Sequence, residues 1–223
     1  MARKSIQLSM KGLKNIVQET IRHYINENYE EDEENLRKTC EELVIDPDRL
    51  KFDTNGVAIF IHNGKYNFIT YDGRVLLDNG VEWAELNDEG YAIVKENGKY
   101  IIFDTDKGKF LKGQFEEVRS DMGYGYIGVK SNGKWNFINI RSNGKIVSKE
   151  WFDDIDPFSE GCASVKKNGK WGFIDEYGYE VAPCIFNDCL PFVKDYTTVF
   201  IGGATLFLTK NGKLFFYKDD IED

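Results

Sequence analysis

One tripeptide, Asn-Gly-Lys, recurs after residue 45 and constrains the fold more than any other feature of the sequence. An Asn-Gly pair between apolar segments favours a tight hairpin, because a type I′ turn needs two successive residues with positive φ. The five copies start at Asn63, Asn97, Asn132, Asn168 and Asn211. Their steps of 34, 35, 36 and 43 residues indicate a repeat protein built from hairpin units.

A segment that alternates between apolar and other residues precedes each turn, and this is the period of a β-strand. These segments are 57–61, 91–95, 126–130, 162–166 and, in the fifth unit, 205–209. The strand after each turn is apolar on both faces, as in Phe68 and Ile69, and in the fifth unit it is 214–216. Because both of its faces need cover, we expect this strand in the middle of the assembly.

Two further short strands are predicted in each unit. A second turn, such as Asp72-Gly73 or Asn143-Gly144, leads into a short strand, and an aromatic-acidic segment then completes the unit. The aromatic-acidic segments are 83–86, 115–118, 152–155 and 185–189, and residues 50–53 correspond to them in the first unit. Four short strands per unit are typical of a small propeller blade or of one coil of a β-solenoid.

The sequence therefore predicts an all-β repeat array of about five antiparallel β-meander units, preceded by a helical N-terminal arm. Three of the four strand types are counted five times, and the strand after the second turn is counted four times. The array thus begins and ends at different points of the unit, and such staggered ends favour a propeller-like or barrel-like closed array. An open β-solenoid is the alternative. The longer last step, with residues 190–203 inserted, is consistent with a closure or with a cap.

The fourth unit carries the residues of a known family. It reads Trp171-Gly172-Phe173-Ile174-Asp175 after a segment that ends in Asn-Gly-Lys, and Phe152-Asp153-Asp154-Ile155 lies upstream. Over about residues 50–218 the pattern resembles the WG-repeat family. The resemblance implies a bacterial or phage repeat module with a scaffold or binding role, without a common catalytic activity and without defined site residues.

The glycine of the Trp-Gly pair is replaced in the other four units. The residues at this position are Asn67, Ile101, Asn136 and, in the fifth unit, Phe215. Asn tolerates a left-handed backbone, whereas Ile and Phe do so poorly. We therefore expect any backbone kink that the family glycine permits to be lost in the second and fifth units.

Residues 1–45 have a different character and are assigned to a helical N-terminal arm, with the β-repeat domain at 46–223. From Ser9 to about Asn26, apolar residues recur with helical spacing, which predicts an amphipathic helix. This helix packs either on its own chain or on a partner or second copy. The acidic run 30–34 is predicted to be a solvated hinge, and a shorter helix is predicted at about 35–43.

The composition excludes several classes of partner. A formal net charge of −9 and an isoelectric point near 4.9 argue against nucleic acid, which needs a clustered basic face, and against an anionic membrane surface. No segment approaches the roughly 18 apolar residues of a membrane span. No apolar run of signal-peptide length follows Arg3 and Lys4. We expect a cytoplasmic protein.

The four cysteines, Cys40, Cys162, Cys184 and Cys189, are expected to be reduced. None of them forms a Cys-x-x-Cys pair, and His23 and His62 lie far from them in sequence. Structural zinc sites usually bring their ligands in close pairs, so we expect no metal site. Nothing in the sequence matches a P-loop or a nucleophile elbow, and we expect no cofactor and no catalytic residue.

The function expected from these observations is that of a non-catalytic scaffold or interaction module. It would bind a protein partner, or alternatively a glycan, through repeat loops and the N-terminal helix. The residues proposed for partner binding are Leu13, Ile16, Val17, Ile21, Tyr24, Tyr124, Tyr177 and Tyr179. Two alternatives remain open: a structural protein, phage-encoded, that oligomerises through the N-terminal helix, and a hydrolase with a site on one face of the array.

Paired acids such as Glu116-Glu117 and Asp153-Asp154 are the residues that a hydrolase would use for acid–base chemistry. Adjacent residues on a strand point to opposite faces of the sheet, however. One such pair is therefore not expected to converge on a substrate.

Overall fold

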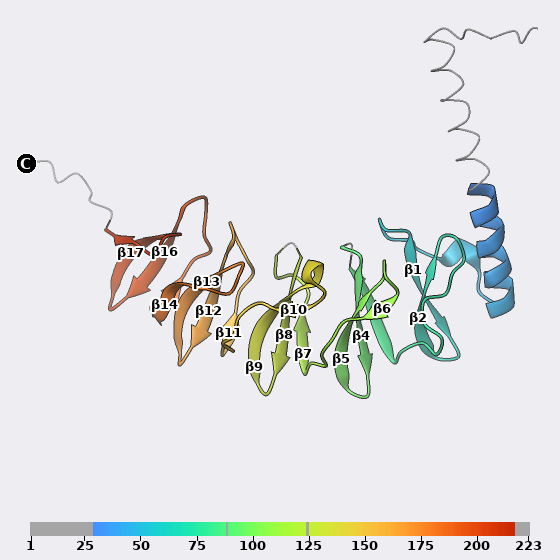
Figure 1. Ribbon diagram of the computed structural model, residues 1–223, viewed down its shortest axis with the longest axis horizontal. Helices are drawn as coiled ribbons and strands as arrows, with labels where there is room; N and C mark the ends of the chain where they lie inside the picture. Colours follow the sequence, from blue (N-terminus) through green and yellow to red (C-terminus); the bar gives the residue numbers. More distant parts are fainter. Residues whose placement is uncertain (1–28, 88, 124, 217–223) are drawn as a thin grey trace, which may run out of the picture. The chain divides into compact units, whose positions relative to one another are not determined.

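The structure is a computed structural model that describes residues 29–87, 89–123 and 125–216 (Figure 1). These residues form two compact parts, which are distinct from the five repeat units. The first ends at Gly80 and the second begins at Val81. The boundary proposed at residue 45 stays a prediction. Among the described residues, no helix combines the length and the hydropathy needed to cross a membrane.

The first unit is a β-hairpin covered by a helix. The hairpin consists of β1 (Val57–His62) and β2 (Lys65–Thr70), and bridges from Phe52 to Ala58 and from Ile69 to Val75 extend it on both sides. A 3-10 helix, η1 (Pro47–Arg49), precedes it. The core joins Ala58, Phe60 and Ile69 of the hairpin to Leu36, Cys40 and Leu43 of the helix.

Among the described residues, that helix covers 29–43 and includes the acidic run 30–34, of which all residues but Asp32 are exposed. The run was expected to be a hinge; here it continues the helix without a break. The turn after β2 packs directly on the helix backbone. A Cβ atom at Gly73 would lie 2.7 Å from the carbonyl oxygen of Asn35, so only glycine allows this approach.

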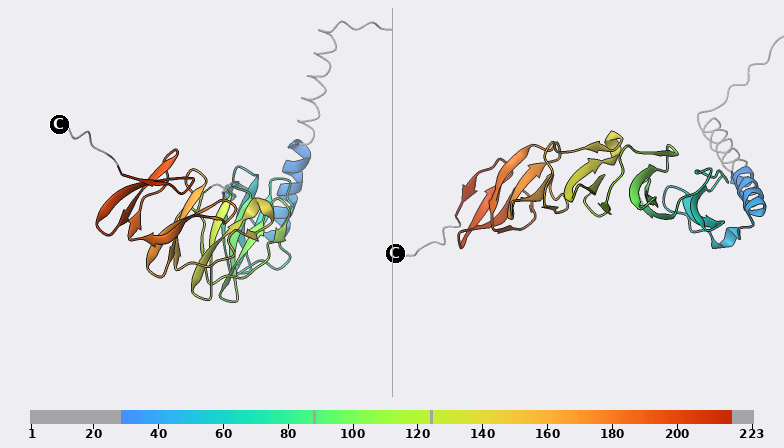
Figure 2. Two further views of the ribbon diagram at one scale, coloured as in Figure 1. Left: turned by 60° about the vertical axis from the view of Figure 1, so that its left-hand side comes forward. Right: turned by 90° about the horizontal axis from the view of Figure 1, so that it is seen from below.

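The second compact part begins at Val81 and contains four antiparallel sheets of four strands each. They are shown in chain order from green to red in Figures 1 and 2. The first two sheets contain β3 (Trp83–Asn87), β4 (Tyr91–Glu96), β5 (Lys99–Asp104) and β6 (Lys109–Phe110), then β7 (Glu117–Arg119), β8 (Tyr126–Ser131), β9 (Lys134–Asn139) and β10 (Lys145–Ile146). The last two contain β11 (Asp154–Ile155), β12 (Cys162–Lys167), β13 (Lys170–Asp175) and β14 (Glu180–Phe186), then β15 (Asp188–Cys189), β16 (Tyr196–Ile201), β17 (Ala204–Thr209) and β18 (Leu214–Phe215). A 3-10 helix, η2 (Ile140–Ser142), follows β9.

The fold class is confirmed as an array of five antiparallel β-meander units behind a helix. The strand after each Asn-Gly-Lys turn lies in the interior of its sheet in the first four units, as predicted. Closure of the array stays a prediction.

The aromatic-acidic segments were expected to complete a unit; they also open the sheet of the next one. The segments 115–118, 152–155 and 185–189 pair first with the unit before them and then with the unit after them. Phe115 exchanges two backbone hydrogen bonds with Tyr100, at 2.8 and 2.9 Å, and Glu116 then donates to Lys130 of the next unit. In the same way, Phe152 exchanges two backbone hydrogen bonds with Trp135. The backbone N–H of Asp153 then donates to the carbonyl oxygen of Lys166 in the next unit. Within residues 81–216, successive repeat units are therefore joined by backbone hydrogen bonds.

The fifth unit was assigned in the wrong register. Residues 205–209 were expected to form the strand before the hairpin turn, but they lie in β17, the strand after it. The hairpin turn is Gly202-Gly203, with φ values of 58° and 84°, and Asn211-Gly212 is the second turn of the unit. The turns at Asn63, Asn97, Asn132, Asn168 and Gly202 are then spaced by 34, 35, 36 and 34 residues. No insertion remains, and the staggered ends that favoured closure disappear.

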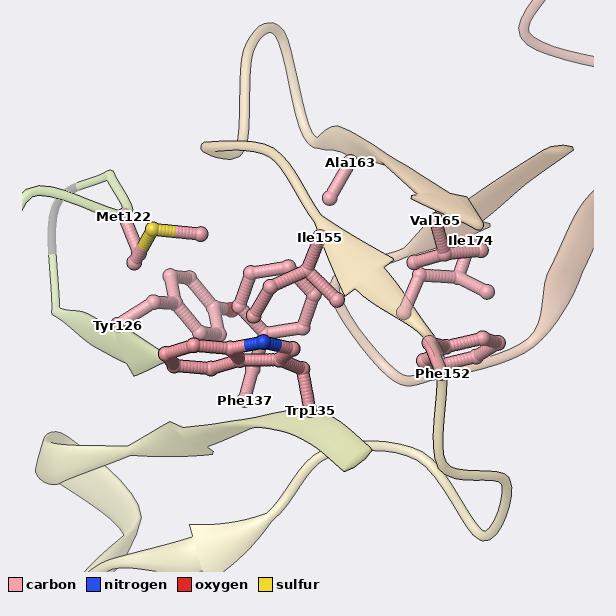
Figure 3. Packing of buried hydrophobic residues seen from close by; sticks show 9 residues of the cluster. All are labelled: Met122, Tyr126, Trp135, Phe137, Phe152, Ile155, Ala163, Val165 and Ile174. Atoms are coloured by element: carbon pink, nitrogen blue, oxygen red, sulfur yellow. The ribbon is translucent and has the colours of Figure 1, made fainter. Parts of the chain in front are cut away.

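Each sheet has two faces, which we call the leading and the trailing face. The leading face carries the first and third residues of the strand before the hairpin turn, and the trailing face carries the second and fourth. Within residues 81–216, the leading faces of the first three sheets pack on the trailing face of the next sheet. The clearest case joins Tyr126, Trp135 and Phe137 to Ala163, Val165 and Ile174, in a cluster that also contains Met122, Phe152 and Ile155 (Figure 3).

The glycine of the Trp-Gly pair has a different role from the one expected. Gly172 is absent from the residues with positive φ, so no left-handed kink is needed. A Cβ atom there would instead lie 2.7 Å from backbone atoms of Ala182, Pro183 and Cys184. Glycine is required by the close passage of β14. In the corrected register, the fifth unit has Leu206 at this position in place of Phe215.

Candidate interaction surface

Two of the residues proposed for partner binding lie together on the surface of the fourth unit. Tyr177 and Tyr179 are 77% and 72% exposed, and both belong to the turn between β13 and β14. The other proposed residues lie outside the part of the chain that the structure describes: Leu13, Ile16, Val17, Ile21, Tyr24 and Tyr124.

The turn that carries the two tyrosines is held by its own hydrogen bonds. The Asp175 carboxylate accepts from the backbone N–H groups of Tyr177 and Tyr179, both at 2.9 Å. Gly178 lies so close to the preceding unit that a Cβ atom would be 2.3 Å from the carbonyl oxygen of Val147. The turn is therefore seated on the third unit, and the backbone that carries both phenol rings is fixed before any ligand arrives.

A groove of about 400 Å³ lies between this turn and the third unit. The third unit contributes β8, the end of β9, η2 and β10, and β10 is the outermost strand of its sheet. The lining residues are Tyr126, Asn139, Ser142, Lys145, Ile146, Val147, Glu176, Tyr177 and Tyr179. An amide, a hydroxyl, an ammonium and a carboxylate thus accompany the aromatic rings.

The floor of the groove differs from its rim in polarity. Tyr126 is 8% exposed, and burial raises the pKa of its hydroxyl, with a further contribution from the negative charge of Glu176. It is therefore a neutral phenol at physiological pH. Lys145 and Glu176 are exposed at the rim. Such a mixture of aromatic rings and hydrogen-bonding groups is typical of polar, non-obligate binding surfaces.

Sequence reasoning missed the polar residues of the groove. Asn139, Lys145 and Glu176 are separated by up to 37 residues and share no motif. They meet because the fourth unit is stacked on the third, with a repeat length of 36 residues at this step. Placing the sequences of consecutive repeats side by side would have shown that these residues come from neighbouring units.

The paired acids form hydrogen bonds and ion pairs within the array, and the first pair acts inside one sheet. Glu116 accepts from the backbone N–H groups of Asn132 and Gly133, at 3.1 and 3.0 Å, and so caps the next hairpin turn. These bonds lower the pKa of its carboxyl. Glu117 pairs with Lys130 at 2.6 Å.

The second acidic pair is used in the same way. Asp153 binds Lys134 and accepts from the N–H of Asn168 at 2.7 Å. The Lys134 ammonium, followed by the backbone N–H groups, lowers the pKa of the Asp153 carboxyl. Asp154 pairs with Arg119 at 2.8 Å.

The thiols show no sign of activation. All four cysteines are free, and burial raises the pKa of each thiol, in Cys189 to about 12. A thiol with a raised pKa is a poor nucleophile at neutral pH. His62 is half-buried at the end of β1. Within the described residues, no three His, Cys, Asp or Glu side chains gather in a way that would hold a metal ion.

Similarity to solved structures is low. The chain aligns with Hsv2 from Kluyveromyces lactis at 12% identity and a TM-score of 0.39, covering 74% of this chain and 60% of that one. It aligns with a structure described as the eukaryotic initiation factor at 11% identity and a TM-score of 0.41, covering 70% and 50%. The chain thus spans about half to two thirds of the length of these structures. No curated protein matches its sequence.

The sequence model of the WG containing repeat matches three times, at residues 68–100, 140–171 and 171–203. Each match crosses from one unit into the next, as the shared aromatic-acidic segments would require. The third match ends at Gly203, within the hairpin turn of the corrected fifth unit. The resemblance stated from Trp171-Gly172 is therefore confirmed: three consecutive segments of this chain match the WG containing repeat.

Proposed function

We propose that this protein is a non-catalytic interaction module that binds an extended segment of a partner protein in the groove between its third and fourth units. The observation that carries the proposal is the pair of exposed tyrosines, Tyr177 and Tyr179, on a turn fixed by Asp175 and Gly178. Rigid tyrosines provide a large contact area at a low cost in conformational entropy.

The chemistry of the groove favours a peptide as ligand. Two phenol rings offer apolar faces and hydroxyl groups, and the adjacent Asn139, Lys145 and Glu176 offer donors and acceptors for a polypeptide backbone. The outermost strand β10 lies along the same groove, and an exposed sheet edge is a common place for an extended peptide to add.

A photo-crosslinking experiment tests this proposal. With p-benzoylphenylalanine at position 177, in the cells that naturally produce the protein, we expect one or a few discrete adducts that are sensitive to protease. The Tyr179→Ser substitution in the same chain should reduce their yield strongly. The matched control places the crosslinker at Tyr71, a 53% exposed tyrosine of the first unit; the same adducts from both positions, or none from position 177, would contradict the proposal.

A glycan is the competing ligand and gives a different result. In that case the purified chain would bind immobilised oligosaccharides, the Tyr177→Ser variant would not, and no protease-sensitive adduct would form. This result would identify the ligand as a glycan and not a peptide.

The proposed absence of catalysis is supported by the use of the paired acids in turn capping and ion pairs and by the raised pKa values of the thiols. A screen of hydrolase substrates tests it, and turnover that Glu116→Gln or Asp153→Asn abolishes while leaving the fold intact would contradict it. We also propose a cytoplasmic location, which the four free cysteines support. Titration of thiols after purification without reductant should find all four reduced.

A further inference from the structure

A second groove, with a volume of about 150 Å³, lies between the second and third repeat units, one repeat before the groove of Tyr177. The two grooves are built at equivalent positions. Tyr91 begins the strand before the hairpin turn and lies opposite Asp104 in its sheet, as Tyr126 lies opposite Asn139 one unit later. In each groove this tyrosine is a buried lining residue. The second groove is therefore a repeat of the first with different side chains.

The charges of the second groove distinguish it from the first. Its lining includes the carboxylates of Glu89, Asp104 and Asp106 and the cations of Lys107 and Arg141. The Asp104 carboxylate is paired within its own turn, because it accepts from the Nζ of Lys107 at 2.6 Å and from the backbone N–H of Lys107 at 2.9 Å. Glu89 and Asp106 are exposed. Negative side chains thus outnumber positive ones in this groove, whereas the first groove contains one of each sign.

The two exposed carboxylates are held beside the floor of the second groove. The Oε2 of Glu89 accepts from the backbone N–H of Gly125 at 2.7 Å, which fixes this carboxylate to the third unit. A Cβ atom at Gly90 would lie 2.9 Å from the Oδ2 of Asp106. Glycine at this position therefore allows the Asp106 carboxylate to lie over the backbone next to Tyr91.

The hydroxyl of Tyr91 is an unused hydrogen-bonding group in this groove. Among the described residues the structure contains no hydrogen bond to or from it, although the side chain is only 2% exposed. Buried hydroxyl groups nearly always have a partner, so an unpartnered one indicates a place where a ligand group binds. Burial, followed by the negative charges of Glu89, Asp121 and Glu85, raises its pKa. It is therefore a neutral phenol that can accept an N–H bond in a negative environment.

We propose that the second groove binds a basic side chain, lysine or arginine, of the same partner segment that occupies the groove of Tyr177 and Tyr179. This inference rests on the proposed function. The ammonium or guanidinium group donates to the Tyr91 hydroxyl and to the carboxylates of Glu89 and Asp106, and such charge-assisted hydrogen bonds are stronger than neutral ones. Stacked sheets lie about 10 Å apart, a distance that about three residues of extended chain span. One segment can therefore reach both grooves.

A titration of the full chain with Nα-acetyl-arginine methylamide tests the second groove by itself. In NMR spectra of the backbone amides we expect a saturable shift at Gly125, whose N–H donates to Glu89. The dissociation constant should rise about threefold in Glu89→Gln and in Asp106→Asn, because each substitution removes one exposed charge. Tyr91→Phe should also weaken binding, while the midpoint of urea unfolding stays unchanged or rises, because the lost hydroxyl has no partner.

Two controls are matched to this titration. Glu82→Gln removes the same charge at an exposed position just before β3. Trp83 pairs with Lys95 near the hairpin turn, so this position lies at the end of the sheet away from the groove, and the dissociation constant should not change. Nα-acetyl-norleucine methylamide has a neutral side chain and should give no saturable shift. Equal binding of this neutral compound, no saturable shift with the arginine derivative, or equal weakening in Glu82→Gln overturns the proposal.

A selection from a phage-displayed library of random dodecapeptides links the second groove to the proposed function. We expect lysine or arginine at one position of the selected peptides, and no such preference when the double variant Glu89→Gln/Asp106→Asn is used for the selection. Peptides that need Tyr177 but show no basic position would overturn this inference and leave the proposed function intact. If no selected peptide depended on Tyr177, the proposed function would fail, and the shared segment with it, even where the arginine derivative binds.

Discussion

The third and fourth units solve the same packing problem with different residues. In both, the interior strand after the hairpin turn must be joined to the segment that follows the second turn. The third unit places Asn136 at this point, fully buried, and the fourth places Gly172. The side chain of one replaces a direct backbone contact of the other, which shows how two such dissimilar residues serve at the same position of the repeat.

In the third unit the asparagine side chain acts as an inserted peptide group. Its Nδ2 donates to the carbonyl oxygens of Ser148 and Glu150, at 2.9 and 2.8 Å. Its Oδ1 accepts from the N–H of Ser148 at 3.3 Å and from that of Phe137 at 2.7 Å. All donors and acceptors of the amide are used, as a buried polar group requires.

In the fourth unit the two strands meet directly. Residues Trp171 and Phe173 of β13 pair with Phe186 and Ala182 of β14, and the register shifts between them. At this shift in register the backbone of β14 passes close over Gly172. A longer strand, seven residues in β14 against two in β10, is the consequence.

Substitution of Gly172 should have the largest effect. In Gly172→Ala the added Cβ meets backbone atoms at 2.7 Å, and backbone cannot move aside as the end of a side chain can. We expect a loss of about 3 kcal/mol or more in the free energy of unfolding, measured by urea denaturation.

Gly128→Ala is the matched control for this substitution. Gly128 also lies in a strand interior without positive φ, but the three atoms nearest to its Cβ would be side-chain atoms, of Ile155, Met122 and Arg119, at 3.1 to 3.3 Å. These can shift by a few tenths of an ångström. We expect a loss of less than about 1.5 kcal/mol; equal losses at both glycines would break the comparison between the third and fourth units.

Removal of the amide in the third unit should come next. Asn136→Ala leaves the carbonyl oxygen and the N–H of Ser148 without their partner in a buried place, and we expect a loss of about 2 to 3 kcal/mol in the free energy of unfolding. Asn136→Gly sharpens the comparison. If glycine restored the direct pairing of the fourth unit, this variant would be more stable than Asn136→Ala. We expect it to be no more stable, because β10 has no counterpart of the β14 backbone that passes close over Gly172.

The first repeat unit also has a buried asparagine at this position, and its side chain makes fewer hydrogen bonds. Asn67 donates to the carbonyl oxygen of Leu77 at 2.6 Å and accepts from its N–H at 3.1 Å, but among the described residues its amide N–H group donates to no second carbonyl as that of Asn136 does. We expect Asn67→Ala to cost about 1 to 2 kcal/mol, in urea denaturation of the full chain. A larger loss than in Asn136→Ala would contradict the view that the number of buried partners sets the cost.

The sequence was sufficient for the repeat, the strand order within a hairpin and the central strand, because turn chemistry and period two are local signals. It was not sufficient for the fifth unit, where Gly202-Gly203 performs the role of Asn-Gly and a misleading Asn211-Gly212 occupies the next turn. The role of Gly172 was missed because a backbone approach at 2.7 Å depends on residues about ten positions away. The groove beside Tyr177 depends on the stacking of two units, which no local pattern encodes.

Acidification should reveal the smallest difference, between the turn caps of the fourth and fifth units. Asp153 binds Lys134 and caps the turn at Asn168, whereas in the fifth unit the neutral Asn187 accepts from Gly202 at 3.2 Å. Because the pKa of Asp153 is lowered in the folded chain, its contribution is present above the unfolded pKa of about 4 and is lost as the pH falls through the folded value. Asp153→Asn should therefore lower the free energy of unfolding at pH 7 by less than about 1 kcal/mol. The difference from the unmodified chain should shrink as the pH is lowered below about 4, measured by urea denaturation at a series of pH values. A difference that stays constant with pH would mean that the carboxylate acts only as a hydrogen-bond acceptor, as the amide of Asn187 does.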